Sequence, residues 1–214
     1  MTAEKIIGIV TFDGVLTSEV VAPAEVFGMA TQRDWFQNWR VIMIGVEEQA
    51  FVTTDEGLRL GVDCTIQDAP SLDVLIVPGA METDELSEHA GLMAFIQKHE
   101  QSAQWLASNC SGAFLLGSSG VLDGKRATTW LGGEGLLQAT YPQINVVFDA
   151  PVVVDNRRLT SNGSLVSYRA ALVLLGKLAG RDAAQEIFNA LKVNRIGDWS
   201  QIEAEIETEI FNTN

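Results

Sequence analysis

The chain has 214 residues, with 14 Lys and Arg against 28 Asp and Glu, so that its formal net charge is −14. This balance excludes nucleic-acid binding through the phosphate backbone, and attachment to an anionic membrane surface, because both require a basic face. We find no apolar run of the roughly 18 residues that a membrane-spanning helix needs, and no signal peptide. Since the two cysteines form no CxxC pair and lie beside no histidine, we expect no disulfide and no metal or cofactor, and a cytoplasmic location.

Short strand-like runs alternate with helical patterns along a chain long enough for a full core. This alternation predicts an α/β fold in which helices sandwich a mostly parallel sheet, as in flavodoxin-like proteins. The expected strands are Ile6–Thr11, Arg40–Val46, Asp73–Val77, Gln104–Ser108, Arg126–Thr129, Asn145–Phe148, Val152–Asp155 and Arg158–Thr160. The expected helices are 18–31, Asp84–Glu100, Ser111–Ser119, Gly133–Ala139, Leu165–Ala179 and Ala183–Leu191. No repeat or linker interrupts the pattern, so residues 1–214 are predicted to form one domain.

The C-terminal segment, at about residues 198–211, has the pattern of an acidic amphipathic helix. Ile202, Ile206 and Ile210 recur every four residues, and glutamates lie between them. Such an isoleucine stripe must be covered. Docking on the chain's own domain and contact with a second copy in a dimer both remain open.

The segment around Cys110 has the spacing of a nucleophile elbow. Ser108, Cys110 and Gly112 follow the small-x-nucleophile-x-Gly pattern, between a short apolar run and a helical one. Such a turn places the sulfur above a helix N-terminus, whose amides and dipole favour thiolate over thiol. A buried structural cysteine is the alternative at Cys110. Cys64 is interpreted as a structural residue at a strand edge or in the core.

A cysteine enzyme also needs a group that transfers protons and donors that stabilise negative charge. In open parallel sheets such groups gather at the carboxyl ends of the strands. Glu19 is either a helix N-terminal carboxylate or a buried carboxyl with raised pKa that donates to a thiolate. Gly79 and Ala80 form a simple turn or, together with Ser111, supply the amides of an oxyanion hole.

The two histidines give no help with proton transfer. His89 and His99 lie among polar residues, and we expect both to be solvated surface residues. No histidine follows Cys110 in the chain, which excludes a Cys-His dyad in the usual order.

Together these features resemble the ThiJ/PfpI superfamily, which has the class I glutamine amidotransferase-like fold. The resemblance runs from Ile6 to about Leu191. The segments that carry it are Phe12-Asp13-Gly14 with Glu19 and Pro23–Phe27, Asp73–Gly79, the elbow continuing into Leu115–Gly117, Gly120–Thr129, and Leu159–Gly163. It implies that Cys110 is the reactive cysteine and that Glu19 is a protonated acid hydrogen-bonded to it. It also implies an anion-binding nook made by the amides of Gly79, Ala80 and Ser111, and a homodimer.

Two departures from the family pattern bear on function. Trp130 stands where many members carry a histidine after paired threonines, so Cys-His chemistry loses a principal group. Trp130 either packs in the core or, with Thr129 and Gly14, forms a pocket wall that selects small uncharged ligands. Ala80 replaces the second glycine of the usual Pro-Gly-Gly turn and would be strained at positive φ.

The resemblance is nearest to isocyanide (isonitrile) hydratases. It implies attack of the Cys110 thiolate on a small electrophilic carbon, a proton from Glu19, a hydroxyl from Ser111 and addition of water. Ser111 stands where threonine is common in the hydratases, and Glu19 where aspartate is expected, which leaves room for another substrate.

Two other functions remain open. The first is a non-catalytic sensor of oxidants or electrophiles, or a stress-protective protein, whose cysteine is oxidised to sulfinic acid. The second is a ligand-sensing domain like those fused to helix-turn-helix regulators. Only 23 residues follow Leu191 and they are acidic, so we expect no DNA-binding part. The expected partners are a small-molecule substrate or oxidant and a second copy of the chain, with no nucleic acid and no membrane.

Overall fold

The computed structural model describes residues 4–208 and is built around a seven-stranded sheet. The strands of this sheet are β1 (Lys5–Thr11), β2 (Trp39–Gly45), β5 (Cys64–Thr65), β6 (Val74–Val77), β7 (Trp105–Asn109), β10 (Val152–Asp155) and β11 (Arg158–Ser161). Their order is β10-β11-β7-β6-β1-β2-β5, and each neighbouring pair is parallel except β10 with β11. Two small sheets accompany it, the antiparallel pair β3 (Phe51–Thr53) and β4 (Arg59–Gly61) and the parallel pair β8 (Arg126–Ala127) and β9 (Asn145–Val146).

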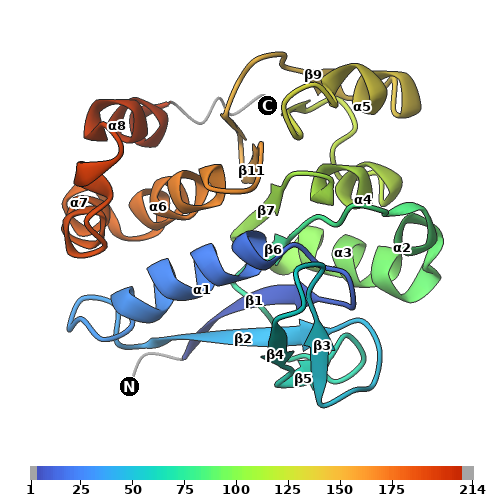
Figure 1. The fold of residues 1–214 in the computed structure, drawn as a ribbon, viewed down its shortest axis with the longest axis horizontal. Coiled ribbons are helices and arrows are strands. Elements are labelled where there is room, and N and C mark those ends of the chain that lie inside the picture. The colour runs from blue at the N-terminus through green and yellow to red at the C-terminus, as the bar shows by residue number, and fades with distance from the viewer. Residues whose placement is uncertain (1–3, 209–214) are drawn as a thin grey trace.

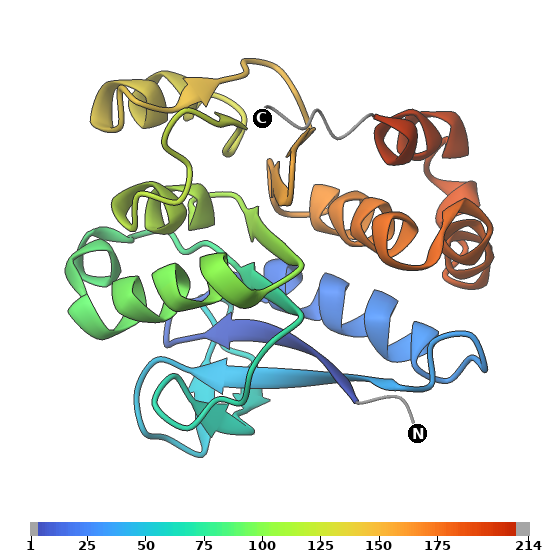
Figure 2. The same ribbon diagram turned by 180° about the vertical axis from the view of Figure 1, so that it is seen from behind.

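Helices cover both faces of the large sheet (Figures 1 and 2). One group contains α1 (Thr17–Ala30), α6 (Val166–Ala179), α7 (Arg181–Ala190) and α8 (Trp199–Glu207). The other contains α2 (Asp84–Glu88), α3 (Ala90–Ser102) and α4 (Gly112–Ser118). The short helix α5 (Glu134–Thr140) lies outside these groups, and the 3₁₀ turn η1 (Val193–Arg195) connects α7 with α8. Because both faces are covered, every residue of the central strand β6 is buried, which explains its uninterrupted apolar run. The predicted α/β fold with a mostly parallel sheet is confirmed.

None of the helices within residues 4–208 is both long enough and apolar enough to cross a membrane.

The prediction of one continuous helix over Asp84–Glu100 is wrong, because His89 divides this segment into the two helices α2 and α3. The backbone of His89 is extended, and its ring Nδ1 accepts a hydrogen bond from Leu92 N at 2.9 Å, which caps α3. The expectation that His99 is solvated is also wrong. His99 is fully buried, its Nδ1 lies 2.9 Å from the Phe95 carbonyl oxygen, and burial lowers its pKa.

Helix α8 packs on α6 of the same chain. Ile202 is buried, and Ile206 lies against Gly176, where a Cβ would overlap its side chain. Arg169 of α6 pairs with Glu205 at 2.6 Å. The isoleucine stripe is therefore covered by the chain itself at these two positions, whereas Ile210 lies outside the described residues.

Candidate functional site

Cys110 occupies a tight turn between β7 and α4. Its φ of 51° lies in the left-handed region, which residues with a side chain rarely adopt. Two hydrogen bonds hold the turn, from Cys110 N to Ser161 O at 2.9 Å and from Thr129 Oγ1 to Cys110 O at 2.8 Å. A Cβ at Gly112 would overlap the Val77 carbonyl oxygen, so α4 can begin this close to β6 only with glycine there. The turn thus has the strained geometry of a nucleophile elbow.

Glu19 extends from the first turn of α1 into the same region and is fully buried. Its Oε2 accepts a hydrogen bond from Gly79 N at 2.6 Å. Its Oε1 makes no hydrogen bond of regular geometry among the described residues, but it lies close enough to the Ser164 amide and the Cys110 thiol for both to act on its pKa. A Cβ built on Gly163 would overlap both Glu19 Oε1 and the Cys110 side chain, so these two groups flank the same glycine. The loops after β1, β6, β7 and β11 therefore meet around one carboxyl group and one thiol.

Burial dominates the electrostatics of this pair. It raises the pKa of Glu19 to about 7, against the opposing effects of the Gly79 and Ser164 amides and of the Cys110 thiol. Burial also raises the pKa of Cys110 to about 12, and the negative charge of Glu19 adds to the rise, while the Ser111 amide and hydroxyl oppose it. Burial thus opposes the thiolate, whereas the Ser111 amide and hydroxyl favour it, and a thiolate at the elbow stays a prediction. The site thus places the sulfur of Cys110 beside a carboxyl group that can accept and return a proton.

The amides assigned to an anion-binding nook are engaged with protein groups. Gly79 N donates to Glu19, and Ala80 N donates to Ser111 Oγ at 2.9 Å. Ser111 Oγ in turn donates to the Ala80 carbonyl oxygen at 2.7 Å. Of the three assigned amides, that of Ser111 acts on the Cys110 sulfur. Ala80 is not among the residues with positive φ, so alanine stands there without the strain that the missing glycine suggested.

The three residues expected to form a pocket wall lie in different surroundings. Trp130 stacks on Phe114 of α4, with ring centroids 5.2 Å apart, and its ring also packs on Gly133. Thr129 is buried and holds the Cys110 carbonyl. Gly14, at φ +81°, faces a separate cleft. The structure thus accounts for Trp130 by packing and for Thr129 by anchoring of the elbow.

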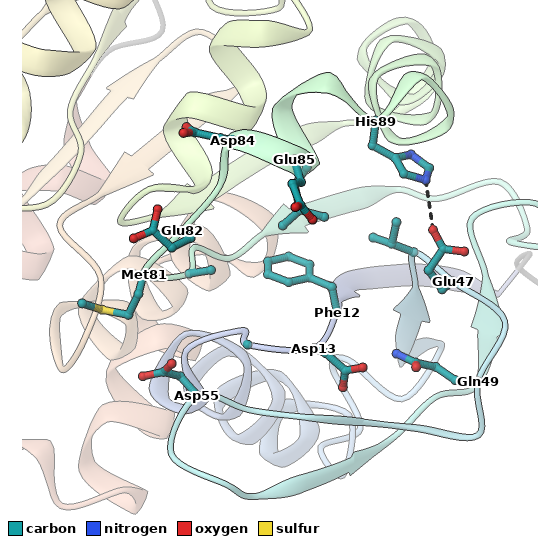
Figure 3. Close-up of a pocket in the computed structure, with 14 residues that line it drawn as sticks. Phe12, Asp13, Glu47, Gln49, Asp55, Met81, Glu82, Asp84, Glu85 and His89 are labelled. Atoms are coloured by element: carbon teal, nitrogen blue, oxygen red, sulfur yellow. Dashed lines mark hydrogen bonds and ion pairs between the residues drawn. The ribbon is translucent and has the colours of Figure 1, made fainter.

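That cleft, shown in Figure 3, has a volume of about 690 Å³ and is lined in part by Gly14, in the loop after β1, and by Ala80, in the loop after β6. Its lining is rich in carboxylates, namely Asp13, Glu47, Asp55, Glu82, Asp84 and Glu85. His89 lies at its edge, with Nε2 3.1 Å from Glu47 Oε1. Cys110 and Glu19 are not among the lining residues. No group of three or more His, Cys, Asp or Glu within residues 4–208 is arranged to hold a metal ion.

Sequence reasoning gave no role to Asn109, Ser161, Gly163 and Ser164, all of which contact the pair or its supports. The segment Leu159–Gly163 is part of the resemblance, and its glycine shortly after a strand is the signal that points to this loop. Asn109 carried no such signal, because its role depends on where α1 places Glu19.

The fold and the site define a class of protein, namely parallel α/β proteins in which a cysteine at a nucleophile elbow adjoins a buried glutamate. The profile of the DJ-1/PfpI family matches residues 5–175, and the chain belongs to this family. The predicted recognition of the ThiJ/PfpI superfamily is thereby confirmed.

Individual relatives differ in what they do. The chain is 36% identical over 135 residues to an isonitrile hydratase of Pseudomonas putida, a match that covers 63% of this chain and 58% of that protein. It is 23% identical over 192 residues to the HTH-type transcriptional regulator GbdR of Pseudomonas aeruginosa, covering 89% of this chain and 51% of the regulator. The crystal structure of a ThiJ/PfpI family protein from Pseudomonas syringae superimposes with a TM-score of 0.79 at 25% identity, covering 92% of this chain and 77% of that one. The matches to the hydratase and the regulator thus span little more than half of either protein.

Proposed function

We propose that the chain is a cysteine-dependent enzyme that adds water to a small neutral electrophile of the isocyanide type. The observation that carries the proposal is the buried contact between Cys110, at its strained turn, and the Glu19 carboxyl group. The similarity to an isonitrile hydratase supports it.

In the proposed reaction the Cys110 sulfur bonds to the terminal carbon of the isocyanide, R–N≡C. Glu19, whose pKa is raised to about 7 by burial, accepts the thiol proton and delivers it to the same carbon. The product is a thioimidate, R–N=CH–S–Cys110. Water then adds to that carbon and a proton goes to nitrogen. Cleavage of the carbon–sulfur bond releases the formamide R–NH–CHO and returns the proton to the thiol.

Ser111 has a supporting role in this proposal. Its backbone amide acts on the sulfur, and its hydroxyl links the turn to Ala80 through two hydrogen bonds. An amide held in this way is suited to stabilise the charge that develops on sulfur during attack and release.

The test is formamide production from a small aryl isocyanide. Replacement of Cys64, the other cysteine, should leave the rate unchanged, which makes Cys64→Ser the matched control for Cys110→Ser. We expect Cys110→Ser to abolish turnover and Glu19→Gln to lower kcat by about 100-fold, the usual contribution of a proton-transfer group. Turnover that survives in Cys110→Ser, or no turnover by the parent protein, would contradict the proposal.

A ligand-sensing domain is the second candidate, favoured by the match of 192 residues to a transcriptional regulator. It predicts tight isocyanide or aldehyde binding without turnover, which calorimetry distinguishes from catalysis. The oxidation-sensor alternative predicts a stable sulfinic acid on Cys110 after peroxide treatment, which intact mass detects as the addition of two oxygen atoms.

We also propose that the chain forms a homodimer. Three apolar side chains are strongly exposed in loops near the site, namely Met81 at 71%, Leu131 at 68% and Leu165 at 74%. Contact with a second copy would remove this apolar surface from water. Sedimentation equilibrium tests the assembly, and a monomer at micromolar concentration would contradict it.

A further inference from the structure

Helix α1 contains a proline, Pro23, four residues after Glu19, and this proline interrupts the backbone hydrogen bonds of the helix next to the site. In a regular helix, residue 23 donates its N–H to the carbonyl of residue 19. Proline has no N–H, so the carbonyl oxygen of Glu19 loses its helical partner. A buried carbonyl in this position needs another donor, and leaving it without one is unfavourable.

Asn109 supplies that donor from another element. Its Nδ2 donates to the Glu19 carbonyl oxygen at 3.2 Å, across 90 positions in the sequence. Asn109 is buried and is the last residue of β7, next to Cys110. The residue that precedes the cysteine therefore holds the backbone of the residue that carries the carboxyl group.

The other end of the Asn109 amide is fixed as well. Its Oδ1 accepts a hydrogen bond from Ser161 Oγ at 2.7 Å, and Ser161 Oγ accepts from Gly163 N at 3.3 Å. Gly163 is the residue that Glu19 Oε1 and Cys110 flank, and glycine is needed there because a Cβ would overlap both side chains. One chain of hydrogen bonds thus connects the backbone of Glu19 with the loop at Gly163, which packs against the Glu19 carboxyl group.

We infer that Asn109 is a positioning residue, which uses the carbonyl freed by Pro23 to hold the Glu19 carboxyl group against Cys110. This inference rests on the Glu19–Cys110 pair of the proposed function but not on the identity of the substrate. Loss of the Asn109 amide releases the first turn of α1, so that the carboxyl group moves toward solvent and away from the thiol.

The test is the pH dependence of Cys110 alkylation by iodoacetamide, measured by mass spectrometry in a Cys64→Ser background. In the parent protein we expect a step in rate near the pKa of Glu19, where the carboxylate becomes able to accept the thiol proton. In Asn109→Ala the step should move down by about one pH unit, and the rate above it should fall about tenfold, as expected for one lost hydrogen bond. Ser161→Ala, which removes the hydrogen bond to Asn109 Oδ1, should move the step in the same direction by less. It replaces Asn109→Ala in this test if Asn109→Ala does not fold.

Two further variants separate positioning from general packing. Ser167→Ala removes a buried hydroxyl, without a partner within residues 4–208, from the same small cavity as Asn109, and it should leave the step unchanged. Pro23→Ala restores a helical N–H for the Glu19 carbonyl, so Asn109→Ala should shift the step less in that background. A lower melting temperature with an unmoved step in both Asn109→Ala and Ser161→Ala would overturn the inference.

The same measurements distinguish failure of this inference from failure of the proposed function. A step that disappears in Glu19→Gln but stays in place in Asn109→Ala contradicts only the inference. A step that responds to Asn109→Ala in a protein without isocyanide turnover supports the inference and contradicts the proposed function.

Discussion

Glu19→Gln should stabilise the protein above neutral pH while it removes proton transfer. Burial raises the pKa of Glu19 from 4.5 to about 7, so the folded state binds its proton more tightly than the unfolded state does. Stability from this group is present below about pH 4.5 and is lost as the pH rises to about 7. At about 1.4 kcal/mol per pH unit, the loss amounts to roughly 3 kcal/mol.

A glutamine fits the same place without this loss. Its oxygen can accept from Gly79 N as Oε2 does, and its amide can face the sulfur where Oε1 has no partner among the described residues. We therefore expect the free energy of unfolding of Glu19→Gln to exceed that of the parent by roughly 3 kcal/mol at pH 8 and to match it near pH 4.5.

The assay is urea denaturation between pH 4 and 8, below the pKa of about 8.5 of an unfolded cysteine. Glu88→Gln, which removes an exposed carboxylate from α2, is the control for the change in net charge and should shift stability by less than about 0.5 kcal/mol. A Glu19→Gln variant that is less stable than the parent at pH 8 would refute the reasoning. So would one that keeps the parent's loss of stability between pH 4.5 and 7.

Other substitutions test the glycine, the serine and the C-terminal helix. Gly163→Ala should destabilise the protein by roughly 3 kcal/mol in urea denaturation and suppress Cys110 alkylation, because the added Cβ overlaps Glu19 and Cys110. The control is Gly57→Ala, which has a similar φ of +86° but open space around it and should lose only about 1 kcal/mol. Ser111→Ala should destabilise by about 2 kcal/mol, since it leaves the buried Ala80 N–H without its acceptor, and calorimetry that shows no change would contradict the assigned hydrogen bonds. Ile206→Ala should destabilise by roughly 2 kcal/mol at every protein concentration, and a loss that grows on dilution would instead indicate that α8 is covered by a second copy.

The sequence predicted the architecture well because its strands are short and apolar and its helices follow them at regular intervals. Strand β6 shows why, since a run buried on both faces is apolar at every position. The break in the predicted helix Asp84–Glu100 was missed because it depends on His89 turning its own ring nitrogen onto Leu92 N. The apolar pattern of residues 84–100 predicts one continuous helix, and only the capping hydrogen bond of His89 divides the segment into two helices.

The candidate site was predictable in its members but not in its protonation. Cys110 and Glu19 could be named from spacing and resemblance, and the structure places them on either side of Gly163. The pKa of Cys110 depends on burial and on the charge of Glu19, and neither can be obtained from the elbow spacing. The use of the Gly79 and Ala80 amides by Glu19 and Ser111 depends on side-chain geometry in the same way.

Burial raises the pKa of both Glu19 and Cys110, so the site disfavours two negative charges and a proton is shared between the two groups. A nucleophile held in this state reacts only when its proton can move to the neighbouring carboxylate, so an electrophile that needs a proton on the attacked carbon suits the site. An isocyanide meets this requirement, because its terminal carbon gains both the sulfur and the proton. An anionic electrophile does not suit it, since Glu19 and the acidic cleft beside Ala80 repel negative charge. Turnover of a neutral isocyanide but not of its carboxylate-bearing analogue is therefore the selectivity that this pair of groups predicts.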